Sequence, residues 1–146
     1  MSSHDILLVE DNPDDVELTR LAFAEAGETH RLHVVSDGAE AVDYLLRRGG
    51  HAARDAAHLP ALVLLDLNLP RLDGREVLQA IRADDITRCL PVVVLTTSAE
   101  PFDIAQAYAL GANSYIQKPV EFDRFVEVVR QVGRYWLSIN LPPGRC

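Results

Sequence analysis

The chain has 146 residues, the length of one ordinary domain, and 48% of them are hydrophobic, so it can bury a sizeable core. Its formal net charge of −8 argues against a direct nucleic-acid partner, because non-specific affinity for nucleic acid comes largely from Lys and Arg. No window approaches the roughly eighteen apolar residues of a membrane span, and the opening "MSSHD" does not resemble a secretory signal. We therefore expect a cytoplasmic domain that binds neither nucleic acid nor membrane. If it carries a signal, another protein has to receive it.

Apolar runs of strand length recur five times along the chain. They lie at 6–9 (ILLV), 32–35 (LHVV), 61–65 (ALVLL), 92–95 (VVVL) and 114–116 (SYI). The first, third and fourth runs are continuously apolar, as central strands buried on both faces are. The second and fifth are shorter or more polar, which is typical of edge strands.

A helical pattern follows each of these runs. Asn12 before Pro13 is a good N-cap and first-turn pair for the first helix. The second pattern follows Asp37, the third starts near Gly74 and the fourth follows Pro101. The fourth places Ile104, Ala105 and Tyr108 at helical spacing, and in the fifth Phe122, Phe125, Val126 and Val129 have the spacing of one buried face.

The regular alternation of strand and helix predicts a parallel sheet with helices on both faces. We therefore predict a three-layer, doubly wound α/β domain with five strands and five helices. The connection over 49–60 is longer than is usual between such elements, and we interpret it as a surface loop.

Polar side chains follow the ends of the predicted strands. Glu10 and Asp11 end the first strand, Asp66 ends the third, Thr96 ends the fourth and Lys118 follows the fifth. In a parallel sheet the carboxyl ends share one edge, and ligands of open α/β sheets bind there, where the strand order reverses. We expect these five side chains to converge.

Three carboxylates that lie close together repel one another unless a cation intervenes. Oxygen ligands without His or Cys favour Mg²⁺ or a similar divalent cation. A carboxylate can also act as a nucleophile toward a phosphoryl group and form an acyl phosphate. Asp66 is the candidate nucleophile, and Lys118 and the Thr96 hydroxyl are candidates to bind the phosphoryl oxygens.

The chain resembles the receiver domain of two-component response regulators over about residues 4–132. The matching segments are "LLVEDN", "LLDLNLPRLDG", "VVLTTS" and "GANSYIQKPV". The spacing between Asp66, Thr96 and Lys118 agrees as well. The resemblance implies a flavodoxin-like sheet with the strand order 2-1-3-4-5, and a single receiver domain over 1–146 with an aromatic extension over 133–146 and no output domain.

The resemblance also implies a role for each residue of the site. A histidine kinase would transfer a phosphoryl group to Asp66, and the domain would catalyse its own phosphorylation and dephosphorylation without a separate substrate. Mg²⁺ would be bound by Asp11, Asp66 and the backbone carbonyl of Asn68, with Glu10 acting through water.

The resemblance further implies three roles in the phosphorylated state and one feature of the backbone. Thr96 and Lys118 would bind the phosphoryl oxygens, and Thr96 and Tyr115 would switch position, with Tyr115 moving from exposed to buried. Asn68 and Thr97 would tune the lifetime of the acyl phosphate. The Lys118–Pro119 peptide bond would be cis.

Within this family, the chain is most similar to the single-domain regulators paired with bacterial and cyanobacterial phytochromes. The segments "LDLNLPRLDGREVL", "LGANSYIQKPV" and the late "YWL" carry this likeness. It makes a phytochrome one candidate kinase. It also implies a homodimer through the fourth helix, fifth strand and fifth helix, together with the C-terminal extension.

Other functions remain open from the residues alone. A Mg²⁺-dependent phosphohydrolase with an aspartate nucleophile would need an acid–base carboxylate two residues after Asp66, where this chain has Asn68. A receiver-like binding module that is never phosphorylated is a second alternative. A nucleotide or flavin binder would call for a glycine-rich turn after the first strand, where the chain is acidic instead.

Overall fold

The computed structural model describes residues 5–25, 31–47 and 59–143. Five strands and five helices alternate along the chain, as predicted. The strands are β1 (Asp5–Val9), β2 (Arg31–Val35), β3 (Leu62–Leu65), β4 (Val92–Thr96) and β5 (Ser114–Gln117). The helices are α1 (Pro13–Glu25), α2 (Gly38–Leu46), α3 (Gly74–Ala83), α4 (Pro101–Ala109) and α5 (Phe122–Arg134). Most of the connection over 49–60 lies outside the described residues.

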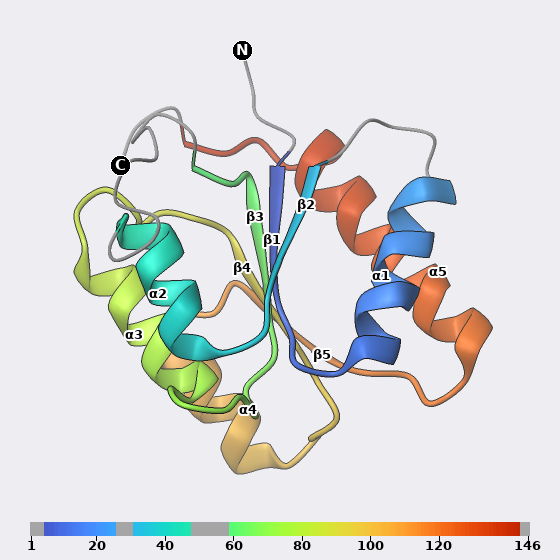
Figure 1. The fold of residues 1–146 in the computed structure, drawn as a ribbon, viewed down its shortest axis with the longest axis horizontal. Helices are drawn as coiled ribbons and strands as arrows, with labels where there is room; N and C mark the ends of the chain where they lie inside the picture. Colours follow the sequence, from blue (N-terminus) through green and yellow to red (C-terminus); the bar gives the residue numbers. More distant parts are fainter. Residues whose placement is uncertain (1–4, 26–30, 48–58, 144–146) are drawn as a thin grey trace.

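The strands form one parallel sheet with the order β2-β1-β3-β4-β5. β1 pairs with β2 on one side and with β3 on the other, so the strand order reverses beside β1. Figure 1 shows α2 and α3 on one face of the sheet and α1 and α5 on the opposite face. The predicted three-layer architecture and strand order are confirmed.

Alternating side chains of the central strands supply two separate cores. Leu7 and Val9 of β1 point toward α2 and α3, where they join Val77, Leu78 and Ile81. The opposite side chains, Ile6 and Leu8, join the core beneath α1 and α5, with Ala22, Phe23, Phe125, Val126 and Val129. Because β1, β3 and β4 are covered on both faces, their apolar runs are continuous.

Short side-chain caps fix where the first three helices begin. The Asn12 carboxamide oxygen accepts hydrogen bonds from the backbone N–H groups of Asp14 and Asp15, at 2.9 and 3.2 Å. Asp37 caps α2 by accepting from the N–H of Glu40 at 2.8 Å, and Asp73 caps α3 by accepting from the N–H of Arg75. These contacts satisfy N–H groups that have no partner within the helix.

The apolar pattern misjudges parts of α4 and α5. On α4 the buried residue is Ala107, whereas Ala105 and Tyr108 are exposed. On α5, Phe125, Val126 and Val129 are buried as predicted, but Phe122 is exposed. The reason is position in the fold, since α4 packs beside the end of the sheet, on Leu67 and Val94, rather than over its centre.

The segment after α5 continues as a short π-helical stretch over Tyr135–Ile139. Trp136 and Leu137 are half-buried against the core that α1 and α5 cover, whereas Ile139 and Leu141 are exposed. The predicted aromatic extension therefore packs partly on its own domain and leaves apolar side chains on the surface.

Within the part of the chain that the structure describes, no helix is both long and apolar enough to cross a membrane.

Candidate functional site

Backbone hydrogen bonds bring the polar strand ends to one edge of the sheet. The N–H of Glu10 donates to the carbonyl of Val35 at 3.0 Å, and the N–H of Asp66 donates to the carbonyl of Val9 at 3.1 Å. On the other side of β3, the N–H of Lys118 donates to the carbonyl of Thr96 at 2.7 Å. The side chains that follow β1 and β3 therefore start beside the reversal of strand order, and Lys118 starts beside the end of β4, the other neighbour of β3.

Gly74 allows the first residue of α3 to lie very close to the backbone of Asp66 and Leu67. A side chain at Gly74 would place its Cβ 2.3 Å from the carbonyl oxygen of Asp66 and 2.7 Å from the Cα of Leu67. Only glycine allows α3 to begin at this distance from the strand. The glycine of the "LPRLDG" segment therefore fixes the backbone around Asp66.

The ammonium group of Lys118 lies at the centre of the site. Its Nζ is 2.7 Å from Oε1 of Glu10, 2.8 Å from Oδ2 of Asp15 and 3.1 Å from Oδ2 of Asp66. Glu10, Asp66 and Lys118 are each buried, with less than a tenth of their surface exposed. The structure thus brings two of the predicted acidic residues and the predicted lysine into direct contact.

Burial and charge change the acidity of this group of side chains. Burial is the largest influence on Glu10 and raises its pKa, the hydrogen bond from Lys118 lowers it, and the charge of Asp66 raises it, so that the pKa lies at about 7. Burial alone would lower the pKa of Lys118. The hydrogen bonds to Asp15 and Glu10 and the charges of Glu10 and Asp66 outweigh it, so the pKa of Lys118 lies above its ordinary value.

Glu10, Asp11 and Asp66 form an all-oxygen cluster suited to a divalent cation. One carboxylate oxygen from each lies within 4.8 Å of the other two. Glu10 and Asp66 are buried and Asp11 is exposed, so the cluster opens to solvent on the Asp11 side. This donor set fits Mg²⁺ or Mn²⁺, which bind carboxylates and retain water.

Thr96 ends β4 with its hydroxyl buried in the protein. Its side chain is fully buried, and Oγ1 has no hydrogen-bond partner among the described residues. Buried hydroxyls are normally hydrogen-bonded, so an unpartnered one needs an explanation. The Thr96 hydroxyl is available to a ligand that arrives beside β4.

The other predicted site residues surround this centre at different distances. The backbone N–H of Asn68 donates to Oδ1 of Asp66 at 3.2 Å, and the Asn68 side chain is exposed. Thr97 is exposed, and its carbonyl accepts from the side chain of Gln117 at 3.2 Å. Tyr115 is half-buried, and its hydroxyl donates to the carbonyl of Ser98 at 3.0 Å.

One expectation from the family resemblance is wrong in this structure. The described residues include Lys118 and Pro119 and contain no cis peptide bond, so the bond between these two residues is trans. The trans form is favoured by about 0.5–1 kcal/mol at an ordinary X–Pro bond. Here it is compatible with the contacts of Lys118 to all three carboxylates.

Asp15 contacts Lys118 as closely as the predicted site residues do, although its role was not expected from the sequence. Asp15 lies in the first turn of α1, three residues after the N-cap Asn12. The sequence did contain an indication of this role, because Asp14 and Asp15 form a second acidic pair in "EDNPDD". Periodicity alone could not indicate that this pair faces the sheet edge.

A second group of polar residues, also missed, ties the loop after Thr96 to two helices. The Ser98 hydroxyl donates to Asp103 at 2.6 Å, and Arg75 donates to Asp103 at 3.0 Å and to Gln106 at 2.7 Å. The hydrogen bond from Ser98 and the charge of Arg75 lower the pKa of Asp103. Burial raises the pKa of Tyr115, which donates to the same loop.

Comparison with known proteins gives a consistent result. Residues 6–130 match the family model described as the response regulator receiver domain. The chain is 44% identical over 140 residues to the "Probable methanogenesis regulatory protein FilR2" of Methanothrix harundinacea, covering 95% of this chain and 87% of FilR2. It is 36% identical over 138 residues to the response regulator Rcp1 of Synechocystis, covering 94% of this chain and 92% of Rcp1.

Solved structures agree with these sequence matches. The phosphorylated cyanobacterial phytochrome response regulator RcpA is 40% identical, with a TM-score of 0.91 over 98% of this chain and 100% of RcpA. The Mn²⁺-bound form of Rcp1 is 35% identical, with a TM-score of 0.89 over 97% of this chain and 99% of Rcp1. The likeness thus extends over nearly the whole of each chain.

Proposed function

Because the chain belongs to the response regulator receiver family, we propose that it accepts a phosphoryl group on Asp66 from a histidine kinase and signals through protein–protein contacts. The observation that carries this proposal is the contact of Lys118 Nζ with Asp66 at 3.1 Å, inside a cluster of acidic oxygens. A nucleophile, a positive charge and a candidate cation site lie together. Phosphoryl transfer depends mainly on such positioning and charge neutralisation.

In the proposed reaction a carboxylate oxygen of Asp66 attacks the phosphorus of a phosphohistidine. An oxygen–phosphorus bond forms, the nitrogen–phosphorus bond breaks, and its electron pair remains on the imidazole. Lys118 and the free hydroxyl of Thr96 are the donors available to the phosphoryl oxygens. Asn68 and Thr97, exposed beside the site, are proposed to control the access of water to the acyl phosphate and hence its lifetime.

We propose Mg²⁺ as the cation, held by Asp11 and Asp66 and the backbone carbonyl of Asn68, with Glu10 acting through water. The clustering of the three carboxylates and the Mn²⁺-bound form of Rcp1 support a divalent cation at this position. When bound, the cation neutralises charge on the phosphoryl oxygens and on the carboxylates around them. Phosphorylation without divalent cation should therefore be lost.

The direct test is incubation with acetyl phosphate and Mg²⁺, followed by intact-protein mass measurement. We expect the gain of one phosphoryl group that hydroxylamine removes, as it does an acyl phosphate. Asp66→Asn should abolish the gain, and so should chelation of the cation. An unchanged mass in the wild type, or an equal gain in Asp66→Asn, would contradict the proposal.

We propose a phytochrome as the histidine kinase. The support is the likeness to RcpA, which is described as a phytochrome response regulator. Phosphoryl transfer from a purified phytochrome kinase should be faster than from unrelated histidine kinases under the same conditions. Equal or slower transfer from the phytochrome would point to a different kinase, and the similarity to FilR2 makes non-phytochrome kinases a necessary comparison.

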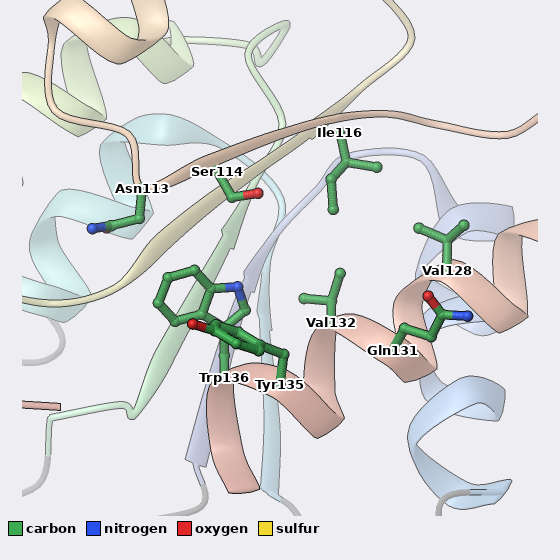
Figure 2. A pocket seen from close by; sticks show the side chains of 8 residues that line it. All are labelled: Asn113, Ser114, Ile116, Val128, Gln131, Val132, Tyr135 and Trp136. Carbon is green, nitrogen blue, oxygen red and sulfur yellow. The ribbon is translucent and has the colours of Figure 1, made fainter. Parts of the chain in front are cut away.

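For the output we propose a homodimer through α4, β5 and α5 together with the C-terminal extension. β5 is an edge strand, and a surface pocket of about 490 Å³ lies between it and the end of α5. Figure 2 shows Tyr135 and Trp136 on one side of this pocket, facing Ser114 and Ile116 of β5. Exposed apolar side chains beyond this point, Ile139 and Leu141, support an apolar interface.

The proposed switch connects the phosphorylation site to this surface. Thr96 would move toward a phosphoryl group on Asp66, and the loop that follows would move with it. Tyr115 on β5 donates a hydrogen bond to the carbonyl of Ser98 in that loop, so a movement of the loop would also displace the Tyr115 side chain. Movement of Tyr115 from half-buried to buried would then alter the surface between α4 and α5.

A further inference from the structure

Asp15 completes the set of contacts made by the Lys118 ammonium. An ammonium group has three N–H donors, and in this structure three carboxylates lie within 3.1 Å of Nζ. Asp15, at 2.8 Å, is closer to Nζ than Asp66 is. The Lys118 side chain is only 6% exposed and that of Asp15 only 18%, so solvent screens this pair weakly.

Asp15 differs from the other two partners because it lies outside the acidic cluster. Glu10 and Asp66 share that cluster with Asp11 and are therefore the oxygens that a divalent cation would engage. A cation at that point would also repel the positive charge of Lys118. With a cation in the cluster, Asp15 is therefore the carboxylate, of the three around Lys118, that interacts with the ammonium and not with the cation.

We propose that Asp15 is a positioning residue that holds the Lys118 ammonium beside Asp66 when a divalent cation occupies the acidic cluster. This inference rests on the proposed function, because it concerns the same phosphorylation site. Asp15 acts through Lys118 and contacts neither the phosphoryl group nor the cation.

The Asp15 side chain can be replaced without loss of the hydrogen bonds that Asp15 makes within the first turn of α1. Its backbone N–H donates to the N-cap Asn12 at 3.2 Å, and its carbonyl accepts from the Thr19 hydroxyl at 2.8 Å. Both contacts involve backbone atoms and survive replacement of the side chain. Asp15→Asn therefore removes the charge that faces Lys118 without removing the cap.

The neighbouring Asp14 provides a matched control. It lies in the same turn and carries the same charge, but its side chain is exposed and its backbone N–H binds the same cap, Asn12. Asp14→Asn changes the net charge by the same amount as Asp15→Asn. Any difference between the two variants therefore reports on contact with Lys118 rather than on overall charge.

The experiment compares wild type, Asp15→Asn, Asp14→Asn and Asp15→Glu. The initial rate of phosphorylation by acetyl phosphate is followed by intact mass over a series of Mg²⁺ concentrations. Mg²⁺ affinity is measured separately by calorimetry without any phosphoryl donor. Thermal unfolding of each variant verifies that it is folded.

We expect Asp15→Asn to slow phosphorylation roughly ten-fold at saturating Mg²⁺, the scale of a lost hydrogen bond to a charged group. It should also weaken Mg²⁺ binding, because the repulsion from Lys118 is no longer offset. Asp14→Asn should remain close to wild type in both measurements, and Asp15→Glu should recover part of the loss. In a Lys118→Ala background, Asp15→Asn should have no larger effect than Asp14→Asn.

The inference is overturned if Asp15→Asn matches Asp14→Asn, or exceeds wild type, in both rate and Mg²⁺ affinity. It is also overturned if the effect of Asp15→Asn persists in full without Lys118. Failure of the proposed function looks different, because the wild type itself would then gain no phosphoryl group. In that case the comparison of Mg²⁺ affinities still decides whether Asp15 acts on the cation site through Lys118.

Discussion

At the scale of single residues, the Thr96 hydroxyl should lower the stability of the folded protein. It is buried without a partner, and an unsatisfied buried polar group costs about 1–3 kcal/mol. Thr96→Val keeps the shape and removes the hydroxyl. We expect the free energy of unfolding to rise by about 1 kcal/mol in cation-free urea titrations.

Thr87 offers the matched control for this substitution. Its side chain is as fully buried as that of Thr96, but its hydroxyl donates to the carbonyl of Ile81 at 2.7 Å. Thr87→Val should therefore lower the free energy of unfolding by about 1 kcal/mol. Equal destabilisation by both substitutions would show that the Thr96 hydroxyl has a stabilising partner after all.

Glu10 gives the apo protein a specific pH dependence. Burial raises its pKa to about 7 from an ordinary value of 4.5, so between these values the folded chain binds more protons than the unfolded chain. The free energy of unfolding therefore falls as pH rises through this window. Glu10→Gln should remove about 2 kcal/mol of that fall between about pH 5 and about pH 8.

The measurement is urea unfolding of wild type and Glu10→Gln at several pH values, in chelator. The difference between the two proteins isolates Glu10 from the other groups that titrate in this range. Excess Mg²⁺ should restore stability to the wild type at high pH, because a cation at the proposed site would bind the ionised folded state. A difference that does not vary with pH would mean that Glu10 stays charged throughout.

Most of the site was predictable because its residues directly follow apolar strands. Glu10, Asp66 and Lys118 each interrupt or follow such a run, and a parallel sheet brings those interruptions to one edge. Asp15 was not predictable in this way. Its position beside Lys118 depends on how α1 leaves the sheet, and a helical pattern does not specify that direction.

At the scale of helices and strands, Arg75 joins α3 to α4 beside the loop that follows Thr96. It donates to Asp73, Asp103 and Gln106, and Asp103 in turn accepts from Ser98. The group therefore ties the first turn of α4 and the preceding loop to the start of α3. Removing Arg75 should loosen this region selectively.

We expect Arg75→Ala to increase amide hydrogen exchange over 97–109 while leaving α5 unchanged. The global free energy of unfolding should change by less than about 1 kcal/mol, because ion pairs with partial exposure contribute little. Arg130→Ala, which removes the pair with Glu127 on α5, is the control. Increased exchange confined to α5 in both variants, or none over 97–109, would show that Arg75 does not hold the loop.

The elements themselves were predictable where burial is two-sided or periodic. β3 is apolar throughout, β1 is apolar after Asp5 and β4 is apolar up to Thr96, and α5 buries Phe125 and Val129 as its spacing predicts. α4 was harder, because it lies at the end of the sheet and buries the small residue Ala107. Its exposed Tyr108 satisfies the same spacing rule without facing a core.

At the scale of the whole molecule, exposed large apolar side chains among the described residues lie on α1, between α3 and β4, on α4, and before, on and after α5. Those used to test the dimer are divided between two of these places. Ile139 and Leu141 follow α5, with 56% and 92% of their surfaces exposed. Ile86, 51% exposed, lies between α3 and β4. The proposed dimer covers the region after α5 and leaves Ile86 exposed.

This division allows the dimer to be tested without disturbing the core. Truncation after Arg134 would also remove Trp136 and Leu137, which pack against the core, so loss of association could then reflect loss of stability. The double substitution Ile139→Ser and Leu141→Ser changes only exposed side chains. Ile86→Ser removes a similarly exposed apolar side chain elsewhere on the molecule.

We expect the double substitution to weaken self-association in sedimentation equilibrium roughly a hundred-fold. Two apolar side chains buried at an interface each contribute about 1.5 kcal/mol or more, and every 1.4 kcal/mol is ten-fold in affinity. Ile86→Ser should associate like the wild type. A wild type that stays monomeric at all concentrations, phosphorylated or not, would rule out the dimer, and equal association by all three proteins would place its interface away from the C-terminal extension.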